Sequence, residues 1–273
     1  MTSGKKIFAV LGTALALAGC QTGKDMVTDD VERSVTEALA QGAKDSMAVN
    51  VTVEYPVSGL STAALEGMTS NIISYVFSPA VDSTYALPDS LLAGKTADDL
   101  GRAADAFVSS QLKNYRDTNL PLFEAQKGMA DQWMLSWETA LSGYFNGSHG
   151  NLATYMVDSY TYMGGAHGMS VRTPIVMSVR DGHIVRESDF FIPDSKDSLT
   201  VMLRRHLPDS FDSMDDYNML FVKDIEPNGN YYVTEEGVNY LYGEYEIGPY
   251  SMGEISVLIP WDEVRSIVKR EYR

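Results

Sequence analysis

The sequence predicts an α+β fold with mainly antiparallel sheets, packed helices and two subdomains. Apolar residues recur at every second position in some stretches, which is typical of half-buried strands, and at every third or fourth position in others, which is typical of helices. The strand patterns come in clusters and do not alternate strictly with helices, and this order favours antiparallel over parallel sheets. The residues after position 20 suffice for one large or two modest domains.

The first residues of the chain predict an export signal and a lipid anchor. Lys5 and Lys6 precede an apolar run, Ile7–Ala18, which at about twelve residues is too short to span a bilayer. The run ends in Leu17-Ala18-Gly19-Cys20, which looks like a bacterial lipoprotein processing box. We therefore expect Cys20 to become the lipidated N-terminus. A lipid bilayer would then be a partner, and the protein would lie in the cell envelope, on the outer membrane or the cell surface.

Cysteine usage agrees with this reading. Cys20 is the only cysteine, which excludes a disulfide within the chain. A single thiol in an exported protein otherwise lacks a purpose, and lipidation supplies one.

The chain is strongly acidic. Its 37 acidic and 21 basic residues give a formal net charge of −16 at pH 7. Nucleic acid and anionic lipid headgroups would be repelled by such a surface over a Debye length of about 8 Å. We therefore expect no nucleic-acid partner, and we expect cationic ligands to fit better than anionic ones. The same charge also keeps the protein soluble.

Residues 21–45 are predicted to be a polar tether with a short helix at Val31–Leu39. Residues 46–148 then predict an N-terminal subdomain with a strand, two helices and a long strand. The four elements are Met47–Tyr55, Leu65–Val76, Leu100–Tyr115 and Trp133–Phe145. Ser61 or Thr62 is the expected N-cap of the first helix.

Residues 149–273 predict a C-terminal subdomain that is richer in strands. The predicted strands are 152–163, 171–180, 183–187, 190–192, 231–233, 238–245 and 255–259. The predicted helices are 199–206 and 262–268. Asp181-Gly182 is a strong hairpin signal between two of the strands. Asp262 is the expected N-cap of the last helix, after Pro260.

A glycine-rich loop, Tyr160–Gly168, links two of the predicted strands. The adjacent Gly164 and Gly165 predict backbone with positive φ, which a Cβ atom disfavours. We expect His167, at the tip of the loop, to point into a surface cleft. The other wall of this cleft would be a tyrosine-rich turn, Tyr245–Gly253.

Two blocks of the C-terminal half carry a family resemblance. The first is Tyr160–Gly168, followed by Ser188-Asp189-Phe190-Phe191. The second is Tyr245–Gly253, followed by Ile255–Pro260. Together they resemble an extracytoplasmic domain family of unknown function that occurs at the C-terminal end of the lysozyme-sensing anti-sigma factor RsiV. Residues 46–148 are similar in layout to the module that often precedes that domain.

The resemblance implies a non-catalytic domain at the cell envelope. We expect a binding or sensing module whose ligand is a basic wall-active protein or a wall glycan (peptidoglycan), with no cofactor and no catalytic residue. The candidate binding residues lie in the two blocks: Tyr160, Tyr162, Gly164, Gly165, His167, Tyr245, Glu246 and Tyr250.

Two other classes of function remain open at this point. A glycan hydrolase or deacetylase accessory would use carboxylate chemistry, which requires Glu244, Glu246, Asp189 and His167 to converge from separate elements. A structural envelope protein would have neither a pocket nor a saturable partner.

Metal sites have weak support in the sequence. The sequence has four histidines, and they are too widely spaced for a zinc motif: His149, His167, His183 and His206. Asp224–Glu235 nearly fits a calcium-binding loop, but Pro227 and the strand pattern that follows it argue for an ordinary turn. We therefore predict no metal ligand.

Overall fold

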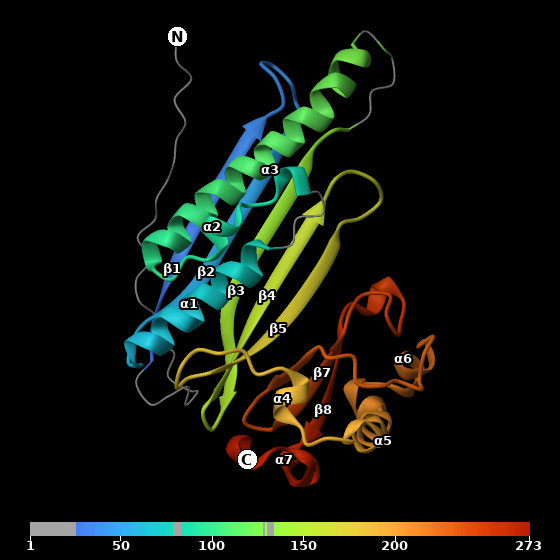
Figure 1. Ribbon diagram of the computed structural model, residues 1–273. Coiled ribbons are helices and arrows are strands. Elements are labelled where there is room, and N and C mark those ends of the chain that lie inside the picture. Colours follow the sequence, from blue (N-terminus) through green and yellow to red (C-terminus); the bar gives the residue numbers. More distant parts are fainter. Residues whose placement is uncertain (1–25, 79–82, 128, 130–133) are drawn as a thin grey trace.

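The computed structural model describes residues 26–78, 83–127, 129 and 134–273 (Figure 1). In this part of the chain a five-stranded and a three-stranded sheet pack with helices, and most strand pairs are antiparallel. The predicted α+β class is therefore confirmed. Cys20 and Trp133 lie outside the described residues. Within the described ranges, no helix combines the length and the apolar character needed to cross a membrane.

The larger sheet has the strand order β1-β2-β3-β4-β5. Its strands are β1 (Val27–Ala38), β2 (Ser46–Ser58), β3 (Trp137–His149), β4 (Leu152–Tyr162) and β5 (Met169–Ser178). Neighbouring strands are antiparallel except β2 and β3, which are parallel. Helices α1 (Thr62–Phe77), α2 (Asp89–Leu92) and α3 (Ala97–Ala125) lie between these two strands in the sequence, as a parallel connection requires. In Figure 1, α1 and α3 lie across one face of the sheet.

The predicted helix at 31–39 is wrong, because this segment belongs to strand β1. Val31 and Val35 face the helices and pack against their core. Two charged residues occupy the same face of the strand. Arg33, between the two valines, pairs with Asp105 of α3 (2.6 Å), and Glu37, after them, pairs with Arg116 of α3 (3.1 Å). The charged side chains on this face hide the two-residue apolar period. Their partners on α3 are visible only in the folded chain, so the segment is predicted as a tether.

Local signals in the sequence begin both long helices. The side chain of Ser61 accepts a hydrogen bond from the N–H of Ala64 (3.2 Å), which confirms the predicted N-cap of α1. Helix α3 begins with a capping box between Thr96 and Asp99. It continues to Ala125, well beyond its predicted end.

The second sheet and its helices form the C-terminal part of the fold. Its strands are β6 (Tyr231–Val233), β7 (Gly237–Tyr242) and β8 (Ile255–Pro260). The helices are α4 (Glu187–Phe190), α5 (Lys196–His206), α6 (Met214–Asn218) and α7 (Trp261–Val264). Their buried apolar side chains form a second cluster, which also includes Leu152 of β4 and Val176 of β5. Both residues face away from α1 and α3, so this part packs on the opposite face of the larger sheet, at one end (Figure 1).

Three local predictions in the C-terminal half are wrong. Residues 183–187 form only an isolated bridge at Ile184, because the chain leaves the sheet there to enter α4. Phe190 ends helix α4 and does not close a strand. The N-cap of α7 is Pro260, whose ring holds the extended backbone that a cap residue needs (φ −61°, ψ 150°), so Asp262 lies inside the helix.

The predicted boundary between residues 148 and 149 falls at the end of strand β3. The sheet continues without interruption through the β3–β4 hairpin to Ser178. Strands β4 and β5 contribute side chains to both hydrophobic clusters. The two parts of the fold therefore share the larger sheet and are not separated by a linker at this turn.

Candidate functional site

The glycine-rich loop and the tyrosine-rich turn lie against each other. The rings of His167 and Tyr250 stack with their centroids 4.1 Å apart and an interplanar angle of 25°. The hydroxyl of Tyr250 donates a hydrogen bond to the carbonyl of Gly168 (3.1 Å), 82 residues away in the sequence. The carboxylate of Glu244 accepts a hydrogen bond from the N–H of Ser170 (3.4 Å). The fold thus joins the two blocks into one surface.

Backbone geometry explains the glycines of the loop. Gly164 and Gly165 have φ values of +93° and +98°, as predicted. Gly168 is required for another reason, because a Cβ atom there would clash with the ring of Tyr160. The hydroxyl of Tyr162 donates a hydrogen bond to the carbonyl of Gly165 (3.1 Å). Both tyrosines of the first block therefore support the loop from strand β4.

A strip of three aromatic rings, the exposed His167 and Tyr245 and the half-buried Tyr250, runs along this contact, and we call it the aromatic strip. The rings of Tyr245 and Tyr250 are 5.6 Å apart, and 50% of Tyr245 is exposed. Its φ of +65° is uncommon for a residue with a side chain. The ring of His167 lies flat on Tyr250, and other residues line the adjoining cavity, so the structure differs from the predicted cleft position of His167.

Glu246 has a local structural role in the same turn. Its carboxylate accepts hydrogen bonds from the N–H of Gly243 (2.7 Å) and from the side-chain amide of Asn228 (3.0 Å). Both contacts fix the backbone between β7 and the aromatic strip. Of the candidate binding residues, Glu246 is therefore engaged by its own turn, while the three rings of the strip form the shared surface.

A polar cavity of about 260 Å³ lies next to this surface. It opens on the face of the larger sheet that points away from α1 and α3. Strands β2 to β5 and the residue before β8 line it, with polar side chains from Asn50, Thr52, Ser142, Asp158, Arg172 and Glu254. Of the candidate binding residues, only Tyr160 contributes to this lining.

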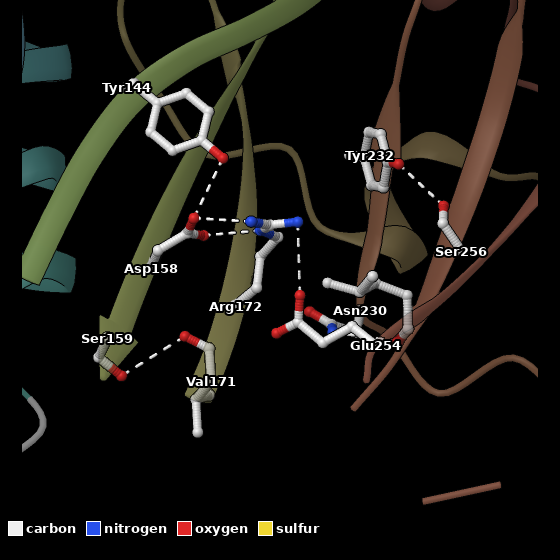
Figure 2. Close-up of polar contacts among 10 residues, drawn as sticks. Tyr144, Asp158, Ser159, Val171, Arg172, Asn230, Tyr232, Glu254 and Ser256 are labelled. Atoms are coloured by element: carbon white, nitrogen blue, oxygen red, sulfur yellow. Dashed lines mark hydrogen bonds and ion pairs between the residues drawn. The ribbon is translucent and has the colours of Figure 1, made fainter. Parts of the chain in front are cut away.

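A charged cluster forms one wall of the cavity (Figure 2). The guanidinium of Arg172 forks onto the two carboxylate oxygens of Asp158 at 2.7 and 2.8 Å. The hydroxyl of Tyr144 donates a third hydrogen bond to Asp158 (3.1 Å). On its other side, Arg172 reaches Glu254 of the C-terminal part at 3.4 Å. Arg172 therefore connects the larger sheet with the second part of the fold.

The environment of Glu254 disfavours its negative charge. Its side chain is only 14% exposed. Burial raises the pKa of this carboxyl, the Arg172 guanidinium opposes the rise, and the Asp158 carboxylate adds to it. A hydrogen-bond donor on a ligand would stabilise the ionised form of the Glu254 carboxyl.

The residues of the enzyme alternative have separate roles in the described part of the chain. No hydrogen bond or ion pair there joins any two of Glu244, Glu246, Asp189 and His167. Asp189 instead accepts a hydrogen bond from the N–H of Arg186 (3.2 Å) at the start of α4.

The structure also bears on metal binding. Within the described ranges, no three His, Cys, Asp or Glu side chains are grouped closely enough to hold a metal ion. In the calcium-like loop, Glu226 forms an ion pair with Lys196 (2.7 Å). The side chain of Asn228 accepts a hydrogen bond from the N–H of Asn230 (3.0 Å). These groups therefore stabilise a turn.

The architecture defines an α+β class in which a helix-covered five-stranded sheet carries a smaller sheet at one end. Residues 188–262 match a family model described as "Protein of unknown function (DUF3298)". This match falls within the predicted C-terminal domain. It contains the tyrosine-rich turn, and the glycine-rich loop precedes it.

Two solved structures share the fold over nearly the whole chain. A member of the DUF3298 family from Bacteroides fragilis has 21% sequence identity and a TM-score of 0.74, and the alignment covers 91% of this chain and 95% of that one. A DUF3298 family protein from Pseudomonas aeruginosa has 16% identity and a TM-score of 0.58, with 92% and 98% covered. Comparison with curated proteins gave no significant match.

Proposed function

We propose that this protein is a lipid-anchored binding module of the cell envelope whose aromatic strip recognises a basic protein. The supporting observation is the stacking of His167 on Tyr250, which unites the two sequence blocks that resemble the RsiV-type domain. A surface assembled from two segments so far apart in the sequence is held by the tertiary fold. It is therefore preorganised for a partner.

The composition of the surface around the strip suits a protein interface. Tyrosine and methionine are enriched at the centres of such interfaces, and charged residues surround them. Met163 of the glycine-rich loop, from which His167 also comes, is a large exposed side chain. Glu244 borders the strip, and the net charge of −16 would steer a basic partner toward it.

The first test measures the binding of lysozyme, a basic wall-active protein, to the chain from residue 21 onward. We expect saturable binding that weakens as salt increases, because surface charges are screened. Tyr250→Ala should weaken this binding by about 30-fold, or about 2 kcal/mol, since it removes the central ring of the strip.

Tyr75→Ala is the matched control for this test. Tyr75 is an exposed tyrosine (37%) that lies on α1. It should leave the affinity unchanged. Equal losses in both variants, or capture of peptidoglycan fragments with no binding of lysozyme, would contradict the proposal of a basic protein ligand.

The lipid anchor is tested separately in cells. Cys20→Ala should release the protein from membrane fractions or block removal of the signal, because the acceptor of the lipid is missing. Unchanged membrane association together with a cleaved N-terminus would show that another feature holds the protein at the membrane.

A further inference from the structure

The polar cavity lies where the C-terminal part stops covering the larger sheet. Along the face of β4 that points away from α1 and α3, Thr154 and Met156 are fully buried under the C-terminal part. The next residue on this face, Asp158, is partly exposed (28%), and Tyr160 follows it. The cavity thus lies at the border between a covered and an uncovered region of the same sheet face. Its floor is rigid because it consists of four paired strands.

The lining of the cavity combines apolar surface with many hydrogen-bonding groups. Hydroxyls come from Thr52, Ser142, Tyr160 and Ser170, and an amide comes from Asn50. Hydroxyl groups both donate and accept hydrogen bonds. A ligand with several hydroxyls of its own would therefore find several hydrogen-bonding partners in the lining.

The charges at the cavity are unbalanced. Asp158 and Arg172 neutralise each other in a bidentate pair, which uses two of the five N–H donors of the guanidinium. Glu254 touches Arg172 through one oxygen at 3.4 Å, and Figure 2 shows its second oxygen turned away from the guanidinium. One negative charge thus remains for a ligand. An anionic ligand would have to compete with Asp158 for Arg172.

We propose that this cavity binds an amino sugar, whose ammonium group pairs with Glu254 and whose hydroxyls bond to the serine, threonine and tyrosine side chains of the sheet. The inference is independent of the aromatic strip, because another set of groups carries it. The volume of about 260 Å³ is just below the roughly 300 to 1,000 Å³ of pockets for drug-sized ligands, which fits one sugar ring.

Three sugars with the same ring and different charge test this proposal. We expect glucosamine to bind the chain from residue 21 onward with a Kd on the order of 1 mM in an NMR or calorimetric titration. Neutral glucose should bind about tenfold more weakly, because it lacks the partner for Glu254, and anionic glucuronate should not bind. No binding of glucosamine, or equal binding of glucuronate, would overturn the proposal.

Two variants assign the binding to this cavity. Glu254→Gln keeps the shape and removes the charge, so glucosamine should lose its tenfold advantage over glucose. Thr52→Val removes one hydroxyl, retains a β-branched side chain in the strand, and should weaken both sugars equally. Circular dichroism checks that each variant is folded. An unchanged glucosamine preference in Glu254→Gln would overturn the proposal.

Glu138→Gln is the matched control. Glu138 lies on the same face of β3 as Ser142 and is exposed, but it does not line the cavity. Its substitution should leave the affinity for glucosamine unchanged. A loss as large as that in Glu254→Gln would mean that general surface acidity attracts the sugar, and the proposed site would be wrong.

Discussion

Gly182→Ala is expected to destabilise the protein by about 2 to 4 kcal/mol, combining the cost of a left-handed backbone with that of overpacking. Gly182 has φ +76°, and a Cβ atom there would lie 2.5 Å from the backbone N of Met68 and 2.7 Å from the carbonyl carbon of Gly67. These are backbone atoms of α1, which cannot rotate away. Asn71 of the same helix also donates a hydrogen bond to the Gly182 carbonyl (2.6 Å).

Gly42→Ala is the control that separates the two causes. Gly42 has a similar φ of +79°, but a Cβ atom there would meet nothing within 4 Å. It should therefore cost only about 1 kcal/mol, the penalty of the left-handed backbone. Urea unfolding measures both values. Equal losses would mean that the turn at Gly182 does not pack closely against the backbone of α1.

Arg172→Met is expected to lower the free energy of unfolding by about 2 kcal/mol at neutral pH. The substitution leaves Asp158 with the hydroxyl of Tyr144 and leaves Glu254 without its cation. Partly buried carboxylates without a partner cost about 1 to 3 kcal/mol. Near pH 3 most carboxyls are neutral, so the difference between variant and parent should become small.

Arg102→Met provides the comparison for an exposed pair. Arg102 contacts Asp99 on α3, and 62% of its side chain is exposed. Such surface pairs contribute about 0 to 1 kcal/mol. If both arginine variants lose the same small amount in urea unfolding, Arg172 does not hold the two parts of the fold together.

Elements whose pattern lies within their own segment of the chain were predictable from the sequence. Strand β2 and helix α1 follow from their own periodicity and caps, and these depend on neighbours within a few residues. Strand β1 was not predictable in this way. Arg33 and Glu37 face α3, where sequence periodicity alone expects apolar residues, because their charges are balanced by Asp105 and Arg116.

In the candidate site, too, local features were predictable from the sequence and tertiary contacts were not. The positive φ of Gly164 and Gly165 follows from local sequence. The stacking of His167 on Tyr250 depends on the packing of β5 beside the C-terminal part, which no local pattern encodes.

The charged cluster was missed because its members look like solvated surface residues in the sequence. Asp158 and Arg172 become opposite neighbours only once the length of the glycine-rich loop sets the register of β4 and β5. Glu254 joins them from the other part of the fold. One sequence signal could have indicated the pair: Asp158 and Arg172 carry opposite charges and lie at similar distances before and after the centre of the glycine-rich loop.

Amide hydrogen exchange with and without lysozyme tests the central claim most directly, because it locates the contact surface without any substitution. The proposed function predicts slower exchange in residues 163–170 and 244–252, which form the loop and the turn around the aromatic strip, and unchanged exchange in α1 and α3. Protection over α1 and α3, or no protection at saturating lysozyme, would contradict it.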